Sequence, residues 1–184
     1  MKPYIISSIV AIMLASSCGD TGDTGSETRS NSNPITHQED VKSDVLSPLL
    51  KGYFELSEAL ADGDSRAASR AAKQMNLTVD DINTRELSDA QQQIFSKLEK
   101  DLLEHTLHIE VNRTDIKHQR EHFKDLSENM IELTASGNTL KPIYLFHCEE
   151  YSKGASWLDR DTIMENPYLG KRSNCGTLEK QPNR

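Results

Sequence analysis

The sequence predicts an all-α domain, an antiparallel four-helix bundle with an irregular C-terminal cap that carries cysteines. Between residues 44 and 137, four segments repeat apolar side chains at three- and four-residue steps, the period of an amphipathic helix. Short polar stretches separate the segments, and short connections favour antiparallel neighbours. From residue 140 to residue 180 this period is absent, and the segment holds the only tryptophan and two of the three cysteines. We therefore expect one folded domain over residues 44–180, with its cap over residues 140–180.

The first helical segment ends at an Asp-Gly-Asp stretch, residues 62–64. An alanine-rich segment follows, for which Asp64 or Ser65 is the expected N-cap, and alanine suits close helix packing. The apolar positions of the first segment are Leu46, Leu49, Leu50, Tyr53, Phe54, Leu56 and Leu60.

The third and fourth helical segments have clearer boundaries. The third begins at Ser88 or Asp89, both of which are good N-cap residues. The fourth begins at Thr114 or Asp115, and Gly137 is expected to end it, because glycine favours helix C-termini.

The first 17 residues predict a signal peptide. Lys2 gives a short basic start, and the apolar run from Ile5 to Leu14 is too short to span a bilayer. The stretch LASSC, residues 14–18, resembles the cleavage site of a bacterial lipoprotein, although Ala15 stands where leucine is usual. We expect Cys18 to be lipidated after cleavage. The alternative is an ordinary secretion signal with an incidental cysteine.

Residues 18–43 predict a flexible tether, because they are rich in Gly, Ser, Thr and Asn and have almost no large apolar side chains. The net charge of the chain is −8, which argues against a nucleic-acid partner. It also argues against electrostatic binding to anionic lipid, so membrane contact is expected through the lipid on Cys18. The expected location is the bacterial cell envelope, lipid-anchored and periplasmic or outer-membrane.

The fourth helical segment carries His118, Glu121 and His122 in the order H-x-x-E-H. Two histidines one helical turn apart can both reach a metal ion, and one class of zinc peptidases uses this spacing with the glutamate as base. Such a peptidase also needs a third ligand and a cleft. The alternative is a solvated helix flank without a metal. If the third and fourth helices pair antiparallel, His105 or His108 would approach His118.

The cap carries Cys148 and Cys175, and an exported protein favours their oxidation. One interpretation is a disulfide between them. Another is a soft nitrogen and sulfur site for Cu(I) or Zn(II), formed by His147, Cys148 and Cys175, with His122 from the bundle. Unpaired thiols are a third interpretation.

Several motifs together resemble an uncharacterised domain of exported bacterial proteins. They are R-x-x-F and L-S (Arg120, Phe123, Leu126, Ser127), then H-C, W-L, N-P-Y-x-G and a final C-G, over Val45 to Leu178. That domain occurs alone in small lipoproteins and at the C-terminus of periplasmic adaptor subunits of heavy-metal efflux pumps of the copper and silver class.

The resemblance implies a compact helical domain, a link to metal handling and no established catalytic activity. His147, Cys148 and Cys175 match positions where the family places soft ligands. The family usually continues H-C-P-M and has Met before the final C-G, whereas this chain reads HCEEY and KRSNCG. Without these thioethers a copper site is less favoured and zinc more so.

The sequence therefore predicts a lipid-anchored envelope protein that is not an enzyme. The expected role is to bind a transition metal or to assist a metal-efflux system. A disulfide-stabilised module that binds an efflux-system or other envelope protein, without metal, is the alternative. A small zinc hydrolase that uses the H-x-x-E-H stretch is a third candidate.

Overall fold

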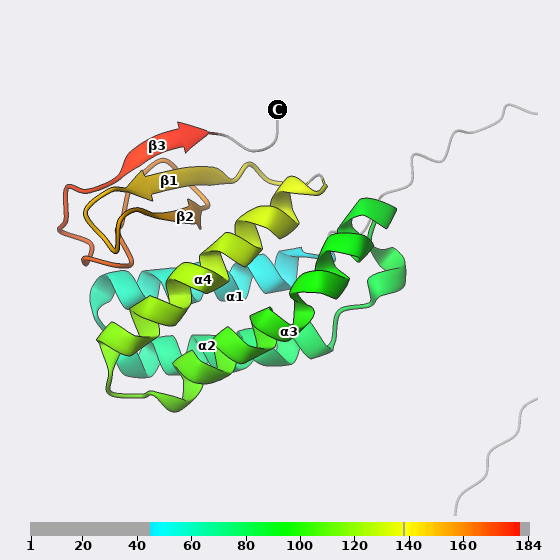
Figure 1. Ribbon diagram of the computed structural model, residues 1–184, viewed down its shortest axis with the longest axis horizontal. Helices are drawn as coiled ribbons and strands as arrows, with labels where there is room; N and C mark the ends of the chain where they lie inside the picture. Colours follow the sequence, from blue (N-terminus) through cyan, green and yellow to red (C-terminus); the bar gives the residue numbers. More distant parts are fainter. Residues whose placement is uncertain (1–44, 138, 181–184) are drawn as a thin grey trace, which may run out of the picture. The chain divides into compact units, whose positions relative to one another are not determined.

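The computed structural model describes residues 45–137 and 139–180. The expected signal peptide, tether and lipidated Cys18 lie outside the described residues. Four α-helices are followed by three short strands (Figure 1). The elements are α1 (Ser47–Asp62), α2 (Ser65–Asp80), the 3₁₀ turn η1 (Thr84–Glu86), α3 (Asp89–Val111), α4 (Ile116–Ala135), β1 (Tyr144–Cys148), β2 (Ala155–Asp159) and β3 (Thr177–Lys180).

The four predicted helices are confirmed. Asp64 caps α2 by accepting hydrogen bonds from the backbone N–H groups of Arg66 and Ala67, at 3.0 and 2.9 Å. Ser88 caps α3 and forms a capping box with Gln91, in which each side chain binds the backbone of the other. These side chains satisfy N–H groups that a helix leaves unpaired at its start.

The ends of α1 and α4 use glycine in different ways. Gly63 ends α1 in the left-handed conformation, with φ of 76°. Helix α4 instead ends at Ala135, and Ser136 after it keeps a right-handed conformation. Gly137 leaves room for the side chain of Gln91, since a Cβ there would lie 2.5 Å from it.

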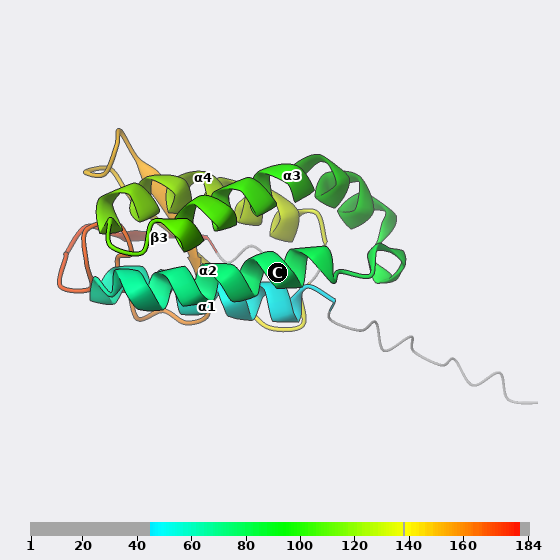
Figure 2. The same cartoon turned by 90° about the horizontal axis from the view of Figure 1, so that it is seen from below.

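The helices form two layers, α1 with α2 and α3 with α4 (Figure 2). In the part of the chain that the structure describes, no helix combines the length and the apolar character needed to cross a membrane.

The predicted fold was correct for the helical core, but the fold is not purely all-α and the cap is not irregular. The cap contains an antiparallel sheet with the strand order β2-β1-β3, and β2 packs against α4. Strands β1 and β2 pair from Tyr144 opposite Asp159 to Cys148 opposite Ala155. Each of these two strands has only five residues, so neither is long enough to give a clear alternating pattern in the sequence.

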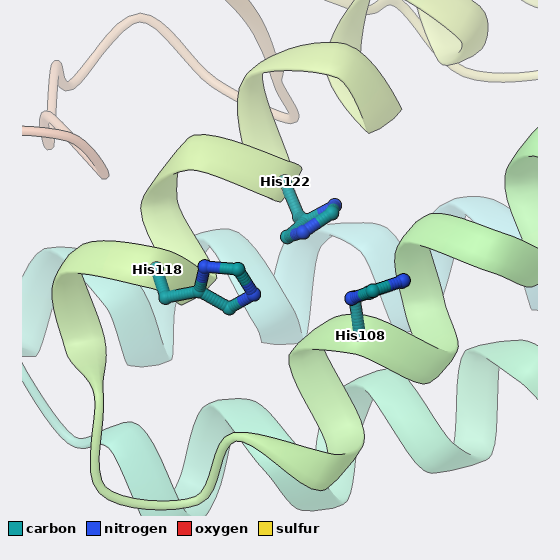
Figure 3. Close-up of side chains that lie close together, drawn as sticks. All are labelled: His108, His118 and His122. Atoms are coloured by element: carbon teal, nitrogen blue, oxygen red, sulfur yellow. The ribbon is translucent and has the colours of Figure 1, made fainter.

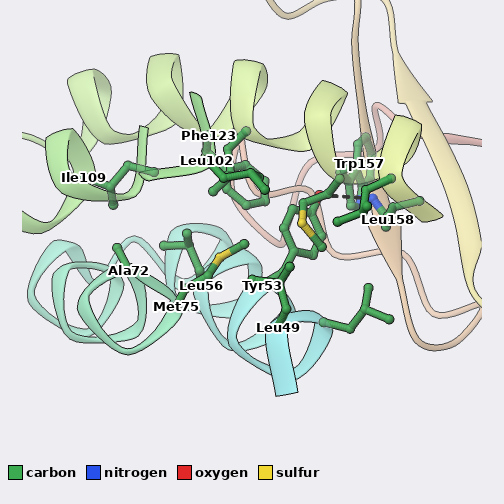
Figure 4. Packing of buried hydrophobic residues seen from close by; sticks show 14 of the residues in the cluster. Leu49, Tyr53, Leu56, Ala72, Met75, Leu102, Ile109, Phe123, Trp157 and Leu158 are labelled. Atoms are coloured by element: carbon green, nitrogen blue, oxygen red, sulfur yellow. Dashed lines mark hydrogen bonds between the residues drawn. The ribbon is translucent and has the colours of Figure 1, made fainter. Parts of the chain in front are cut away.

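The side chain of Tyr53 joins both helical layers to the sheet. Its hydroxyl lies 2.7 Å from Oγ of Ser127 on α4 and accepts a hydrogen bond from the backbone N–H of Leu158 on β2, at 3.2 Å. Its ring stacks on Phe123, with the ring centroids 5.2 Å apart. Tyr53 and Trp157 are fully buried in one apolar core that continues from the helices into the sheet (Figure 4).

Arg120 fastens the cap to the helices, and Asn166 holds two parts of the cap together. Arg120 on α4 donates from Nε to the carbonyl of Pro167, at 2.9 Å, and from Nη2 to the carbonyl of Leu60 on α1, at 2.8 Å. The amide of Asn166 donates to the carbonyl of Cys175, at 2.6 Å. The cap is therefore a bonded part of the domain and not a loose extension.

Candidate metal centre

Four histidines meet where α3 ends and α4 begins. His105 and His108 lie on the last turns of α3, and His118 and His122 lie on the first turns of α4. The short turn between the helices brings these ends together, which matches the approach expected for an antiparallel pair. In Figure 3 the rings of His108, His118 and His122 are directed into a shared space between the two helices.

His108, His118 and His122 have the geometry of a metal-ligand group. One ring nitrogen from each lies within 4.8 Å of those of the other two, and all three side chains are half-buried. Among the described residues, this is the one such group of three or more His, Cys, Asp or Glu. The rings of His108 and His122 are stacked, with centroids 4.2 Å apart, and His118 meets His122 edge-on at 4.6 Å.

The fourth histidine contacts only one member of the group at hydrogen-bond distance. Nδ1 of His105 lies 3.1 Å from Nδ1 of His122. The ring centroids of the two residues are 5.4 Å apart. His105 is therefore positioned as a partner of His122.

Glu121 lies on the outside of the cluster. Its carboxylate oxygen is 3.7 Å from Nδ1 of His118, and its side chain is 54% exposed. A zinc peptidase would need this carboxylate beside the ion to activate a water molecule. Here it contacts the ring of a candidate ligand from the solvent side.

The pKa of His122 is lowered from the ordinary histidine value. Burial away from water is the main cause, and the neighbouring His108, His118 and His105 add to it, against an opposing effect of Asp125. A lower pKa keeps the ring neutral at physiological pH. A neutral imidazole has the lone pair that a metal ion binds.

The residues fit a transition-metal ion after small ring movements. A tetrahedral ion about 2.0–2.1 Å from each nitrogen holds neighbouring nitrogens about 3.3 Å apart, so the group has to contract. One of the stacked rings of His108 and His122 also has to rotate, because a bound ion lies in the plane of each imidazole. Rotation about χ2 of histidine has a broad energy minimum, so this movement costs little.

The cap residues predicted as soft ligands are arranged differently. Cys148 and Cys175 form a disulfide, with the sulfurs 2.05 Å apart, so neither offers the thiolate that a metal ion needs. Nδ1 of His147 lies 2.9 Å from the hydroxyl of Ser156, and its Nε2 lies 3.4 Å from Glu149. In the described structure, the group around His122 consists of histidines from α3 and α4 and has no residue from the cap.

The i, i+4 spacing of His118 and His122 identifies two of the three residues from sequence alone. His108 belongs to another helix, and only the antiparallel pairing of the two helices indicates that it completes the group.

Comparisons with known proteins place the helical part of the chain in a family. Residues 49–141 match the family described as "Protein of unknown function (DUF3347)". No curated protein and no solved structure matches the chain. The match covers the four histidines but ends before β1, so it is shorter than the resemblance over Val45 to Leu178. Because it spans just over half of the chain, the chain belongs to the DUF3347 family of proteins of unknown function.

Proposed function

We propose that this protein binds a transition-metal ion through His108, His118 and His122, and that it is not an enzyme. The observation that carries the proposal is the convergence of three ring nitrogens within 4.8 Å of one another, from two helices that a short turn holds together. Three imidazoles without a carboxylate or thiolate suit Zn(II), and also copper or nickel. An ion bound there would link the end of α3 to the start of α4.

The N-terminal segment and the family resemblance support a place in the cell envelope. The first 18 residues support export and lipidation at Cys18, and the family resemblance supports a role beside metal-efflux systems. We propose a lipid-anchored envelope protein that holds a metal ion for such a system, or that responds to the ion.

The test is metal retention by the purified full chain. We expect about one zinc ion per chain after dialysis, measured by elemental analysis, and its loss when His108, His118 and His122 are all replaced by alanine. His147→Ala is the matched control, because His147 is also half-buried but lies in the cap, hydrogen-bonded to Ser156. The control is expected to keep the metal.

Circular dichroism of each metal-free variant shows whether the helices are intact. Equal zinc retention by the folded triple variant and the wild type would refute this site. Loss of metal in His147→Ala, with the three helical histidines present, would move the site to the cap.

A second candidate function is a protein-interaction module without metal. The observation that favours it is the Cys148–Cys175 disulfide, which stabilises the cap and removes both thiols from metal chemistry. This candidate predicts that protein purified from the envelope has both cysteines oxidised and retains no zinc or copper. Elemental analysis of the wild type therefore separates the two functions.

A further inference from the structure

We propose that His105 is a positioning residue of this metal site, which accepts a hydrogen bond from Nδ1–H of His122 and so presents Nε2 of His122 to the ion. The inference rests on the proposed metal-binding function. It assigns a role to the fourth histidine of the cluster and identifies the nitrogen through which His122 binds.

The contact between the two Nδ1 atoms decides the tautomers. They lie 3.1 Å apart, which is the distance of a hydrogen bond. A neutral imidazole has one N–H donor and one acceptor nitrogen, so one Nδ1 must donate and the other must accept.

Only one of the two arrangements leaves His122 able to bind a metal ion. If His105 donates, Nδ1 of His122 is occupied as the acceptor and its Nε2 carries the proton, so neither nitrogen is available. If His122 donates, its Nε2 has a free lone pair. With this contact kept, so that His108 is the ring that rotates, metal binding by His122 requires His105 to be the acceptor.

The same arrangement excludes His105 as a fourth ligand. When Nδ1 of His105 accepts the hydrogen bond, the proton of that ring lies on Nε2, so His105 has no free lone pair. His105 then acts through His122, as outer hydrogen-bond partners of metal-binding histidines do.

Outer hydrogen-bond partners of metal-binding histidines fix the tautomer and the ring orientation, and their removal typically weakens metal binding by about 10–100-fold. The carboxylate of Glu121, 3.7 Å from Nδ1 of His118, is beyond hydrogen-bond distance, so this role is assigned to His105 and not to Glu121.

The experiment compares His105→Ala with His105→Asn in the full chain. The side-chain oxygen of asparagine lies near the position of Nδ1 in histidine and can accept the hydrogen bond from His122. We measure zinc affinity by competition with a chromophoric chelator, and coordination from the visible spectrum of the Co(II)-loaded protein. His105→Ala should bind one ion about 10–100-fold more weakly than the wild type. His105→Asn should recover most of this loss, with a Co(II) spectrum like that of the wild type.

A second measurement reads the tautomer directly. Nitrogen-15 spectra of the zinc-loaded wild type should show His122 bound through Nε2, with its proton on Nδ1. Ligation through Nδ1 of His122 would overturn the inference.

The affinity data can overturn it in two further ways. Wild-type affinity in His105→Ala would mean that the hydrogen bond does not position His122. Equal losses in both variants, with a Co(II) spectrum that has lost a nitrogen ligand, would make His105 itself a ligand. If the wild type binds no metal, the proposed metal-binding function itself is wrong. This result differs from the three outcomes above, in each of which the wild type binds a metal ion.

Discussion

Replacing Cys148 and Cys175 together by alanine tests the cap and the metal site in one protein. The disulfide joins the end of β1 to the segment before β3, across a sequence separation of 27 residues. In the chain-entropy model, closing a loop of this length stabilises the folded state by about 3.5 kcal/mol, because the cross-link restricts the unfolded chain. Cys148 is 1% exposed, and alanine leaves no polar atom there.

The assay is equilibrium unfolding in urea. With a slope of about 2 kcal/mol per molar urea, a loss of about 3.5 kcal/mol moves the midpoint of unfolding down by about 1.8 M. The double variant should still fold, since domains are commonly stable by about 5–15 kcal/mol. Reduction of the wild type by dithiothreitol should produce a similar shift and should leave the variant unchanged.

Zinc retention by the same double variant separates the two candidate metal sites. The three helical histidines are intact in it, so we expect one zinc ion per chain, as in the wild type. A midpoint shift below about 0.5 M would refute the stabilising role of the disulfide. Loss of zinc by the folded variant would refute the helical site and favour ligands in the cap.

Two further predictions concern stability. Tyr53→Phe removes the hydroxyl that bonds Ser127 and the backbone of Leu158; the buried groups left unpaired should cost about 1–3 kcal/mol in urea unfolding, and no change would contradict this. Burial raises the pKa of Asp159 from 3.8 to about 6. Because the unfolded chain loses this proton first, stability falls as the pH rises from about 4 through 6. Asp159→Asn should therefore match the wild type near pH 4 and exceed it by about 1 kcal/mol at pH 7.5, after allowance for solvent screening; an equal gain at both pH values would contradict this reasoning.

The helices could be predicted because their signals are local. Ser88 and Gln91 form the start of α3 within four residues of chain. The sheet could not be predicted in this way, because β1 and β2 are too short to show a clear alternating pattern and the pairing of β3 is not local. Strand β3 pairs with β1 from about 30 residues further along the chain, and its last described pair is Leu145 with Lys180.

The motifs of the cap have structural roles that the sequence alone does not indicate. The amide oxygen of Asn166 accepts hydrogen bonds from the backbone N–H groups of Tyr168 and Leu169, both at 2.8 Å, which closes the N-P-Y turn. Gly176 of the final C-G stands where a Cβ would lie 2.5 Å from the sulfur of Met164 and 3.0 Å from Trp157. Packing therefore accounts for this turn and this glycine without a ligand.

Only part of the candidate site could be predicted from the sequence, for a related reason. The spacing of His118 and His122 is visible within α4, but His108 joins them only through the pairing of two helices. The cap cysteines suggested ligands because free thiolates bind metal ions. The sequence does not show that Cys148 and Cys175 lie close enough to form a disulfide instead.

The two sides of helix α4 differ in what their side chains contact. Arg120 and Phe123 face the cap and the core, where Arg120 bonds the carbonyls of Pro167 and Leu60 and Phe123 stacks on Tyr53. His118 and His122 face α3, where apolar or amide side chains would pack without a titratable group. The lowered pKa of His122 means that the fold opposes protonation of this ring, so this histidine reduces stability as the pH falls. Packing alone does not offset that loss of stability. The proposed metal ion would offset it, because it would stabilise the neutral rings and connect the two helices at the turn where they meet.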